Sequence, residues 1–491
     1  MSAVRCHGFV SGEKERSSFC VYDRTSPTGG LPTRMTAHLL RIAAMAANPC
    51  EMPRVWPRWL GGALICLALP GIAWAQTDSA ELREEDDEPN QHAILEPVGT
   101  ESASERSQWL LDGAELVLKP RTYYLYRDYD VANTRAGWAL GGGLEFRSGW
   151  WQDRIRFGAT VSTSQKLYGP SDKDGTQLFK PGPEAFTVFS EAYATVRLGG
   201  DHGVHIGRQS IDLPYMGKHD LRMIPNTFNA VTVGNKPSDG LAYMAGYVDS
   251  IKYKDSDEFT PMSEAAGAED TDKGLTFWGF RYRMPDQSVY GLIHQRTPDL
   301  FHTTFAKAEK RLEFSEDLSL WADVSYTQQS SIGEELIGDF KTHLISTRLE
   351  LVAGNNKFRV GASRTDDGGD IQKPYGNPAN YLSIIINDFD RADEDAFSLG
   401  YSRDMGQVGP GKLSFFANMV WGDTPDSGPN ASPDASEFDL TVDWRLNEGW
   451  SETVWVRLRA AWVHQDDNYP GADDLFDFRI IVNYDFDLLS R

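Results

Sequence analysis

Residues 438–444 read FDLTVDW, and residues 318–327 read LSLWADVSYT. In both stretches an apolar or aromatic side chain occupies almost every second position, and mainly polar side chains lie between. A period of two is typical of a β-strand with two different faces. No helical period appears from about residue 116 to the end of the chain. The two stretches therefore predict a body made of strands.

The same alternation recurs throughout this body. The other strands that we expect are 122–129, 143–149, 154–161, 186–198, 203–209, 240–253, 275–283, 288–295, 302–314, 342–352, 357–363, 397–402, 411–421, 452–464 and 476–487. Together with the first two stretches, they give about sixteen to eighteen strands.

The segments between the strands fall into two size classes. Short turns include 149–153, 199–202 and 354–356. Long loops rich in Gly, Pro and Asp are 168–185, 209–239, 254–274, 364–396 and 422–436. Short periplasmic turns at one rim and long extracellular loops at the other are typical of an outer-membrane barrel. The predicted fold class is all-β, a transmembrane antiparallel β-barrel.

Aromatic residues near the strand ends agree with this interpretation, because membrane barrels carry aromatic girdles at both interfaces. They are Trp138, Trp150, Trp151, Trp278, Tyr282, Trp421, Trp444, Trp450, Trp455 and Trp462. The alternative fold is a large secreted β-sandwich or propeller, which would act as a binding protein. We find no repeat of blade length in the sequence.

Composition excludes several other classes of protein. The 491 residues include 71 acidic and 48 basic side chains, for a net charge of −23. Nucleic acid is therefore not an expected partner, because a binder needs a basic face. The mean hydropathy of −0.44 argues against a bundle of membrane helices. Aromatic residues make up 12% of the chain, which argues against disorder.

The first part of the chain is predicted to direct export. Residues 54–75 combine two arginines, a short apolar segment and the sequence Ala73-Trp74-Ala75, which is the pattern of a cleaved signal peptide. We expect 1–53 to be an over-long gene start, with translation beginning at Met45 or Met52. Residues 76–118 are expected to form an acidic, flexible periplasmic extension, and 119–491 the barrel. All four cysteines precede residue 76, so the mature chain would contain none.

Several stretches carry a resemblance to a known family. They are GRQS at 207–210, Leu213-Pro214, DLRMIPNTFNA at 220–230, VRLRAAW at 456–462 and FRIIVNYDF at 478–486. These stretches resemble the OprD family of substrate-specific outer-membrane porins, and the resemblance extends over about 119–491.

The resemblance implies a barrel of 18 strands in a Gram-negative outer membrane, as a monomer or a loose trimer among outer-membrane lipids. It also implies diffusive uptake of small solutes, often carboxylates, through a narrow pore lined by an arginine ladder. A long loop would fold inward to narrow the pore, and 209–239 matches it. This chain departs from the family expectation in being strongly acidic, which argues against a dedicated anion pore.

The period of two also predicts which arginines face the pore. Arg457 and Arg459 alternate with apolar residues, and so does Arg479 in the last strand. A lipid-facing Arg at mid-membrane costs about 2–4 kcal/mol, so these side chains should point inward. The candidate pore-lining residues are Arg457, Arg459, Arg479, Arg147, Arg154, Arg156 and Arg222. The same parity places Arg281, Arg283, Arg348 and Arg359 inside.

Two functions remain open for these arginines. A ladder of guanidinium groups attracts anions and holds carboxylates through paired hydrogen bonds. Alternatively, each arginine pairs with an inward acid and only fills the barrel. The acids available for such pairs are Glu145, Asp323, Glu350, Asp439 and Asp443.

Motifs for catalysis and metal binding are not found in the sequence. It contains no G-x-S-x-G, no P-loop and no H-E-x-x-H, so we predict neither a catalytic site nor a cofactor. His202 and His205 lack further ligands nearby, and the acidic loops 171–175 and 366–370 lack calcium-site spacing, so no metal is expected. The enzymatic alternative is an outer-membrane hydrolase, which would need an outward Ser–His pair at the rim.

Overall fold

The computed structural model describes residues 110–111, 113–235, 240–446, 454–466 and 469–489. The predicted signal peptide at 54–75, the over-long start at 1–53 and most of the extension at 76–118 lie outside the described residues. The described residues belong to the compact unit Asp78–Arg491.

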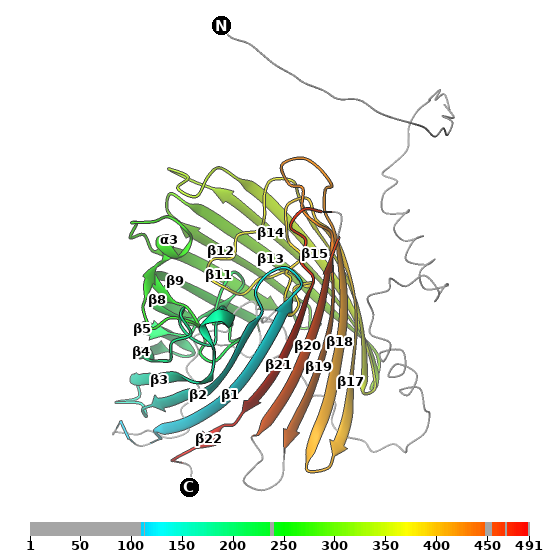
Figure 1. The fold of residues 1–491 in the computed structure, drawn as a ribbon. Coiled ribbons are helices and arrows are strands. Elements are labelled where there is room, and N and C mark those ends of the chain that lie inside the picture. Colours follow the sequence, from blue (N-terminus) through cyan, green and yellow to red (C-terminus); the bar gives the residue numbers. More distant parts are fainter. Residues whose placement is uncertain (1–109, 112, 236–239, 447–453, 467–468, 490–491) are drawn as a thin grey trace, which may run out of the picture. The chain divides into compact units, whose positions relative to one another are not determined.

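Eighteen long strands form one antiparallel ring (Figure 1). They are β1 Glu115–Tyr129, β2 Arg135–Arg147, β3 Ile155–Tyr168, β4 Phe186–Gly199, β5 His202–Gln209, β8 Thr227–Asn235, β9 Gly240–Lys252, β11 Leu275–Arg283, β12 Val289–Thr297, β13 Phe301–Ser315, β14 Leu318–Ser331, β15 Lys341–Ala353, β16 Asn356–Thr365, β17 Asp395–Val408, β18 Gly411–Asp423, β19 Ala435–Leu446, β20 Trp455–Gln465 and β21 Leu475–Asn483.

The remaining elements are short. They are the 3-10 helix η1 Ser171–Lys173, β6 Asp212–Leu213, β7 Met216–Gly217, β10 Thr260–Pro261, the helix α3 Met262–Ala265 and β22 Phe486–Asp487. β6 pairs with β7 in a small hairpin of its own, whereas β22 extends the pairing of the last strand with β1.

The ring closes because β1 pairs with β2 on one side and with β21 on the other. Each of the other long strands pairs with its two neighbours along the chain. A closed ring leaves no free edge, so every strand can satisfy its backbone hydrogen bonds inside a bilayer. The predicted all-β, antiparallel transmembrane barrel of 18 strands is confirmed.

One strand was missed by the sequence analysis. β8 falls inside the segment 209–239, which was expected to be a single loop. The loop proper is therefore 210–226. The period of two is hidden in β8 because Phe228 and Ala230 point inward and are buried, while Val231 on the other face is also apolar. Both faces are apolar because the inner face packs against the preceding loop.

Strand parity separates a polar interior from an apolar exterior over most of the wall. On β19, Asp439 and Asp443 are buried on the inner face. On the outer face, large apolar side chains such as Leu349 and Trp278 are almost half exposed in the isolated chain, at 46% and 48%. Such residues form the surface that would contact lipid.

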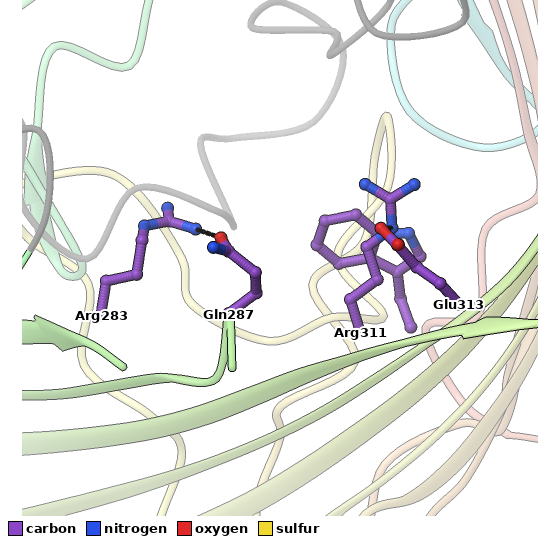
Figure 2. Close-up of a pocket in the computed structure, with 5 residues that line it drawn as sticks. Arg283, Gln287, Arg311 and Glu313 are labelled. Carbon is purple, nitrogen blue, oxygen red and sulfur yellow. Dashed lines mark hydrogen bonds and ion pairs between the residues drawn. The ribbon is translucent and has the colours of Figure 1, made fainter. Parts of the chain in front are cut away.

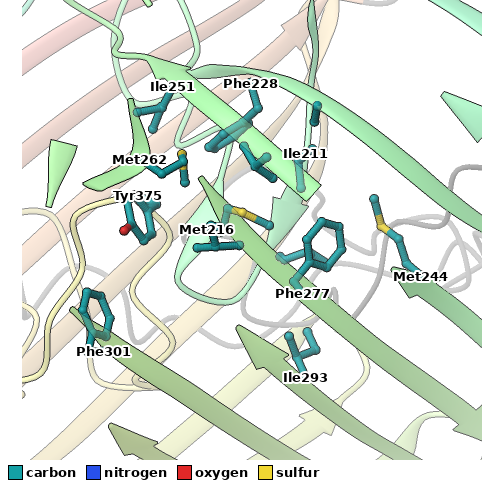
Figure 3. Close-up of a cluster of buried hydrophobic side chains, with 14 of the residues drawn as sticks. Ile211, Met216, Phe228, Met244, Ile251, Met262, Phe277, Ile293, Phe301 and Tyr375 are labelled. Atoms are coloured by element: carbon teal, nitrogen blue, oxygen red, sulfur yellow. The ribbon is translucent and has the colours of Figure 1, made fainter. Parts of the chain in front are cut away.

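Two long loops enter the barrel. Loop 210–226 carries Ile211, Leu213 and Met216, which pack in a buried apolar cluster against β8, β9, β11 and β12 (Figure 3). Loop 366–394 extends from β16 to β17. The Tyr375 hydroxyl lies 2.9 Å from Thr297 Oγ1 on β12, and Ile386 N donates to Glu437 on β19 at 2.8 Å. Loop 366–394 therefore contacts opposite parts of the inner wall.

Candidate functional site

The two inward loops contact each other. Tyr215 N donates to Asn377 O at 2.8 Å, and Gly217 N donates to Tyr375 O at 3.1 Å. The Asn377 amide also donates to Asp212. Gly217 is required at this contact because a Cβ there would collide with the Asn377 side chain. Loops 210–226 and 366–394 are thus joined through their backbones inside the barrel.

Basic side chains concentrate on the inner face of β20, β21 and β1. Arg459 on β20 is paired in register with Arg479 on β21, and Arg457 is paired in register with Asp443 on β19. Side chains at paired positions of neighbouring strands lie about 5 Å apart at Cβ. The adjacent strands therefore hold a group of guanidinium groups, which we call the arginine wall: Arg121, Arg127, Arg457, Arg459 and Arg479.

Three of these arginines form ion pairs with two buried acids, Asp443 and Asp477. Arg457 donates to both carboxylate oxygens of Asp443 at 2.7 Å, and both side chains are buried. Arg479 donates to Asp477 at 2.5 Å, and the same carboxylate accepts a hydrogen bond from Arg127 at 2.8 Å.

Arg459 differs from these neighbours. Its Nε donates to Thr441 Oγ1 at 3.3 Å, and among the described residues it forms no ion pair within 4.0 Å. Arg459 therefore retains donors and a charge that a passing anion could use.

Loop 210–226 brings a further arginine to this wall. Arg222 donates to the carbonyl oxygens of Thr176 and Leu221 at 2.9 and 2.8 Å, and it forms no ion pair with any described residue. Burial and the nearby charge of Arg479 lower the pKa of Arg222 to about 10, so it stays charged near neutral pH.

The loop is fixed to the arginine wall through Arg121. Its guanidinium donates to the carbonyl oxygen of Arg222 at 2.5 Å and to Asp220 at 2.6 Å. The strand β1 thus holds the tip of loop 210–226 in place.

Loop 366–394 is held against the same region by two buried carboxylates of β19. Glu437 accepts hydrogen bonds at 2.8 Å from the amides of Ile386 and Asn387, and Asp439 accepts one at 2.9 Å from Ile385 N. The alternative in which inward acids pair with arginines included Asp439, whereas in the structure this carboxylate accepts a hydrogen bond from the loop backbone. No sequence signal predicts this contact, because the partners are 51 and 54 residues apart.

The other candidate arginines are spread around the barrel. Arg147 on β2 pairs with Glu115 at 2.5 Å, and the Arg156 guanidinium lies 4.8 Å from the centre of the Trp150 ring. Arg154 lies in the exposed turn before β3. The inward arginines Arg348 and Arg359 form ion pairs with Asp323 and Glu350 at 2.9 and 2.8 Å.

Metal ligands do not converge in the described part of the chain. No group of three or more His, Cys, Asp or Glu residues there could hold an ion. His202 Nδ1 lies 2.9 Å from the Tyr243 hydroxyl, whereas His205 stacks on Tyr193, and the odd spacing places the two imidazoles on opposite faces of β5. In loop 366–370, Asp366 accepts hydrogen bonds from the backbone N–H groups of His343 on β15 and of Gly368. No helix among the described residues is long and apolar enough to span a bilayer.

Comparison with solved structures agrees with the barrel. The OpdK porin of Pseudomonas aeruginosa, solved with vanillate, is 21% identical, with a TM-score of 0.68 over 77% of this chain and 100% of the other. OccK9 (OpdG) of the same species is 20% identical, with a TM-score of 0.70 and the same coverage. A BenF-like porin from Pseudomonas fluorescens Pf-5 is 21% identical, with a TM-score of 0.68 over 77% of this chain and 100% of the other.

No curated protein sequence matches the chain closely enough to count as a relative. The family model described as outer membrane porin, OprD family, matches residues 109–488. This family is one of porins of the Gram-negative outer membrane and not of enzymes, so the expected family and location are confirmed. The chain belongs to the OprD family of outer-membrane porins.

Proposed function

We propose that this porin takes up small organic anions that carry a carboxylate, by passive diffusion past Arg459 and Arg222. The observation that supports this most directly is the state of these two arginines. Both lie inside the barrel, and neither forms an ion pair with a described residue. A guanidinium keeps its charge and presents a planar fork of donors that matches a carboxylate.

The path of the solute would pass between the two inward loops and the arginine wall. Loops 210–226 and 366–394 are joined to each other and are anchored on opposite parts of the barrel, so they would narrow the pore to a gap beside β20 and β21. Arg457 and Arg479, which are ion-paired, would shape this gap and would contribute less charge than Arg459.

The other support is chemical. Vanillate, a carboxylate, is bound by the relative OpdK. The net charge of −23 does not oppose anion transport here, because charges far from the path are screened within about 10 Å at moderate salt. We also propose that the chain acts as a monomer or a loose trimer among outer-membrane lipids, with no nucleic-acid partner.

The test is a comparison of solutes of equal size and different charge. In planar bilayers with a KCl gradient, the reversal potential should indicate anion preference, and liposomes should take up benzoate faster than the neutral benzamide. Replacing both Arg459 and Arg222 by Gln should reduce the anion preference and the benzoate rate. Equal rates for the two solutes in the unmodified porin would refute the proposal and leave a general diffusion pore.

A further inference from the structure

A second group of basic side chains lies far from the arginine wall. In the closed ring of 18 strands, β11 is nine strands away from β20 in either direction, which is half of the circumference. Arg281 and Arg283 lie on β11, and Arg311 lies on β13, all on the inner face by parity. The turns β11–β12 and β13–β14 are short, so this end of the barrel is the periplasmic mouth.

Two of these side chains, Arg283 and Arg311, line a pocket on the inner wall. A pocket of about 290 Å³ is lined by Arg283, Gln287, Arg311, Glu313 and Trp321. Figure 2 shows these side chains rising from the same stretch of wall, with Arg283 and Gln287 on one side and Arg311 and Glu313 on the other. Arg311 and Trp321 are paired in register across β13 and β14, which fixes the arginine beside the indole.

The arginines at and beside this pocket form only long contacts with neighbouring polar groups, or none. Arg283 donates to Gln287 Oε1 at 3.4 Å, which is long for a hydrogen bond. Arg311 Nε lies 3.3 Å from Glu313 Oε1, and its guanidinium lies 5.1 Å from the centre of the Trp321 ring. Arg281 forms no hydrogen bond or ion pair with the residues that the structure describes. The two arginines that line the pocket therefore exceed its one acid, Glu313, and Arg281 adds a third positive charge beside them on β11.

A nearby acid does not remove this excess. Glu309 on β13 is 3.5 Å from Lys307 Nζ, so its charge is already matched by a buried lysine. Gly291 on β12 lies in register between Arg281 and Lys307, so no side chain separates these two cations. Lys307 and Glu309 balance each other, so the excess positive charge near the pocket belongs to Arg281, Arg283 and Arg311.

We infer that this pocket is a second binding site, for a small planar organic carboxylate, at the periplasmic mouth. Arg283 and Arg311 supply the forked donors that a carboxylate requires, and the Trp321 indole supplies an apolar wall for a ring. The volume lies just below the range for small-molecule pockets, about 300–1,000 Å³, and suits a ligand with a single ring. The site is separate from Arg459 and Arg222, so this inference can be tested independently of the proposed function.

With this pocket, a transported carboxylate would meet two separate binding sites, first Arg459 and Arg222 and then the pocket at the periplasmic mouth. A solute that leaves the arginine wall reaches the pocket before it enters the periplasm. Because the pocket opens at the mouth, a solute added on the periplasmic side meets it without crossing the constriction.

The experiment uses the full porin in planar bilayers with benzoate as the probe, added to each side in turn. In the unmodified porin, benzoate should interrupt the current from both sides. The double variant Arg283→Gln plus Arg311→Gln should raise the half-blocking concentration of benzoate added on the periplasmic side at least about tenfold. This is the factor expected for the loss of one charged hydrogen bond. Block from the other side should change less than about twofold.

The matched control is Arg445→Gln. Arg445 lies at the periplasmic end of β19, with its guanidinium 5.2 Å from the Trp455 ring, so its replacement takes one positive charge from the same mouth, as each single replacement in the pocket does. Block that is unchanged in the double variant, or equally weakened in the control, would overturn the inference. If the double variant fails to fold, as judged by migration on unheated gels, Arg283→Gln alone serves, because its one 3.4 Å hydrogen bond cannot hold the barrel together.

Discussion

Arg457 and Arg459 lie two residues apart on the same face of β20, yet their replacement should affect different properties. Replacing Arg457 should lower stability, and replacing Arg459 should lower anion preference. Arg457 is 4% exposed and forms two hydrogen bonds of 2.7 Å with Asp443, which is 2% exposed. Arg457→Gln would remove two hydrogen bonds and the ion-paired counter-charge at 2.7 Å from the buried Asp443 carboxylate. Removing one partner of a buried ion pair costs about 3–5 kcal/mol. We therefore expect Arg457→Gln to lower the free energy of unfolding by roughly that amount.

Arg459→Gln should leave stability almost unchanged. The residue loses only a hydrogen bond of 3.3 Å to Thr441 Oγ1, which corresponds to about 1 kcal/mol at most. The same replacement removes a charge that no described acid neutralises within 4.0 Å, so anion preference in a KCl gradient should fall. Arg457→Gln, in contrast, should change the anion preference little in the fraction that folds.

The assay combines urea unfolding in lipid vesicles, followed by tryptophan fluorescence, with reversal potentials in planar bilayers. The control is the double variant Arg457→Gln plus Asp443→Asn, which removes both charges and should recover at least half of the lost stability. The reasoning is refuted if Arg457→Gln is as stable as the unmodified porin, or if Arg459→Gln is the less stable of the two.

Three further predictions concern the barrel and its loops. The unheated porin should migrate differently from the boiled one on gels, because a closed ring resists detergent, and identical migration would contradict closure. Glu437→Gln should weaken the attachment of loop 366–394 by roughly 2 kcal/mol and raise both conductance and current noise, whereas Asp426→Asn in an exposed loop should change neither. The pKa of His219 is lowered to about 3 by burial and by the positive charges of Lys254, Arg222 and Lys373. As the pH falls below about 6.5, His219 therefore binds a proton when loop 210–226 is released but not when the loop is docked. Current noise should therefore rise as the pH falls, and His219→Gln should abolish this rise.

The alternation of side chains was enough to predict most of the wall, because lipid on one side and polar contents on the other impose a period of two. The two stretches with the clearest alternation are strands: 438–444 lies within β19 and 318–327 within β14. The prediction failed at β8, where Phe228 and Ala230 face a loop and not water. A strand that packs against protein on its inner face has no reason to alternate in polarity.

Inward orientation was also predictable for the arginines, whereas their partners were not. Parity alone places Arg457, Arg459 and Arg479 on one face, and this holds for any antiparallel ring. Which acid each one meets depends on register between neighbouring strands, which a single sequence does not reveal. The register places Asp443 opposite Arg457 but Thr441 opposite Arg459.

The interior of the pore is the part least accessible from sequence, because loops and not strands decide it. Asp439 is an inward acid on a strand close to several arginines, and an ion pair with arginine was one of the two alternatives that the sequence left open for it. Glu437 lies on the same face of β19. They bind the amides of Ile385, Ile386 and Asn387 instead, because a loop that enters the barrel brings unpaired backbone N–H groups that must find acceptors. Asp439, the inward acid next along β19, is thereby bound by the loop, and Arg459 lies in register with Thr441, so Arg459 forms no ion pair within 4.0 Å among the described residues. The hydrogen bond that attaches the loop at Ile385 therefore also keeps Asp439 from pairing with Arg459. Loosening the loop should let Asp439 pair with Arg459 and so reduce the anion preference of the pore.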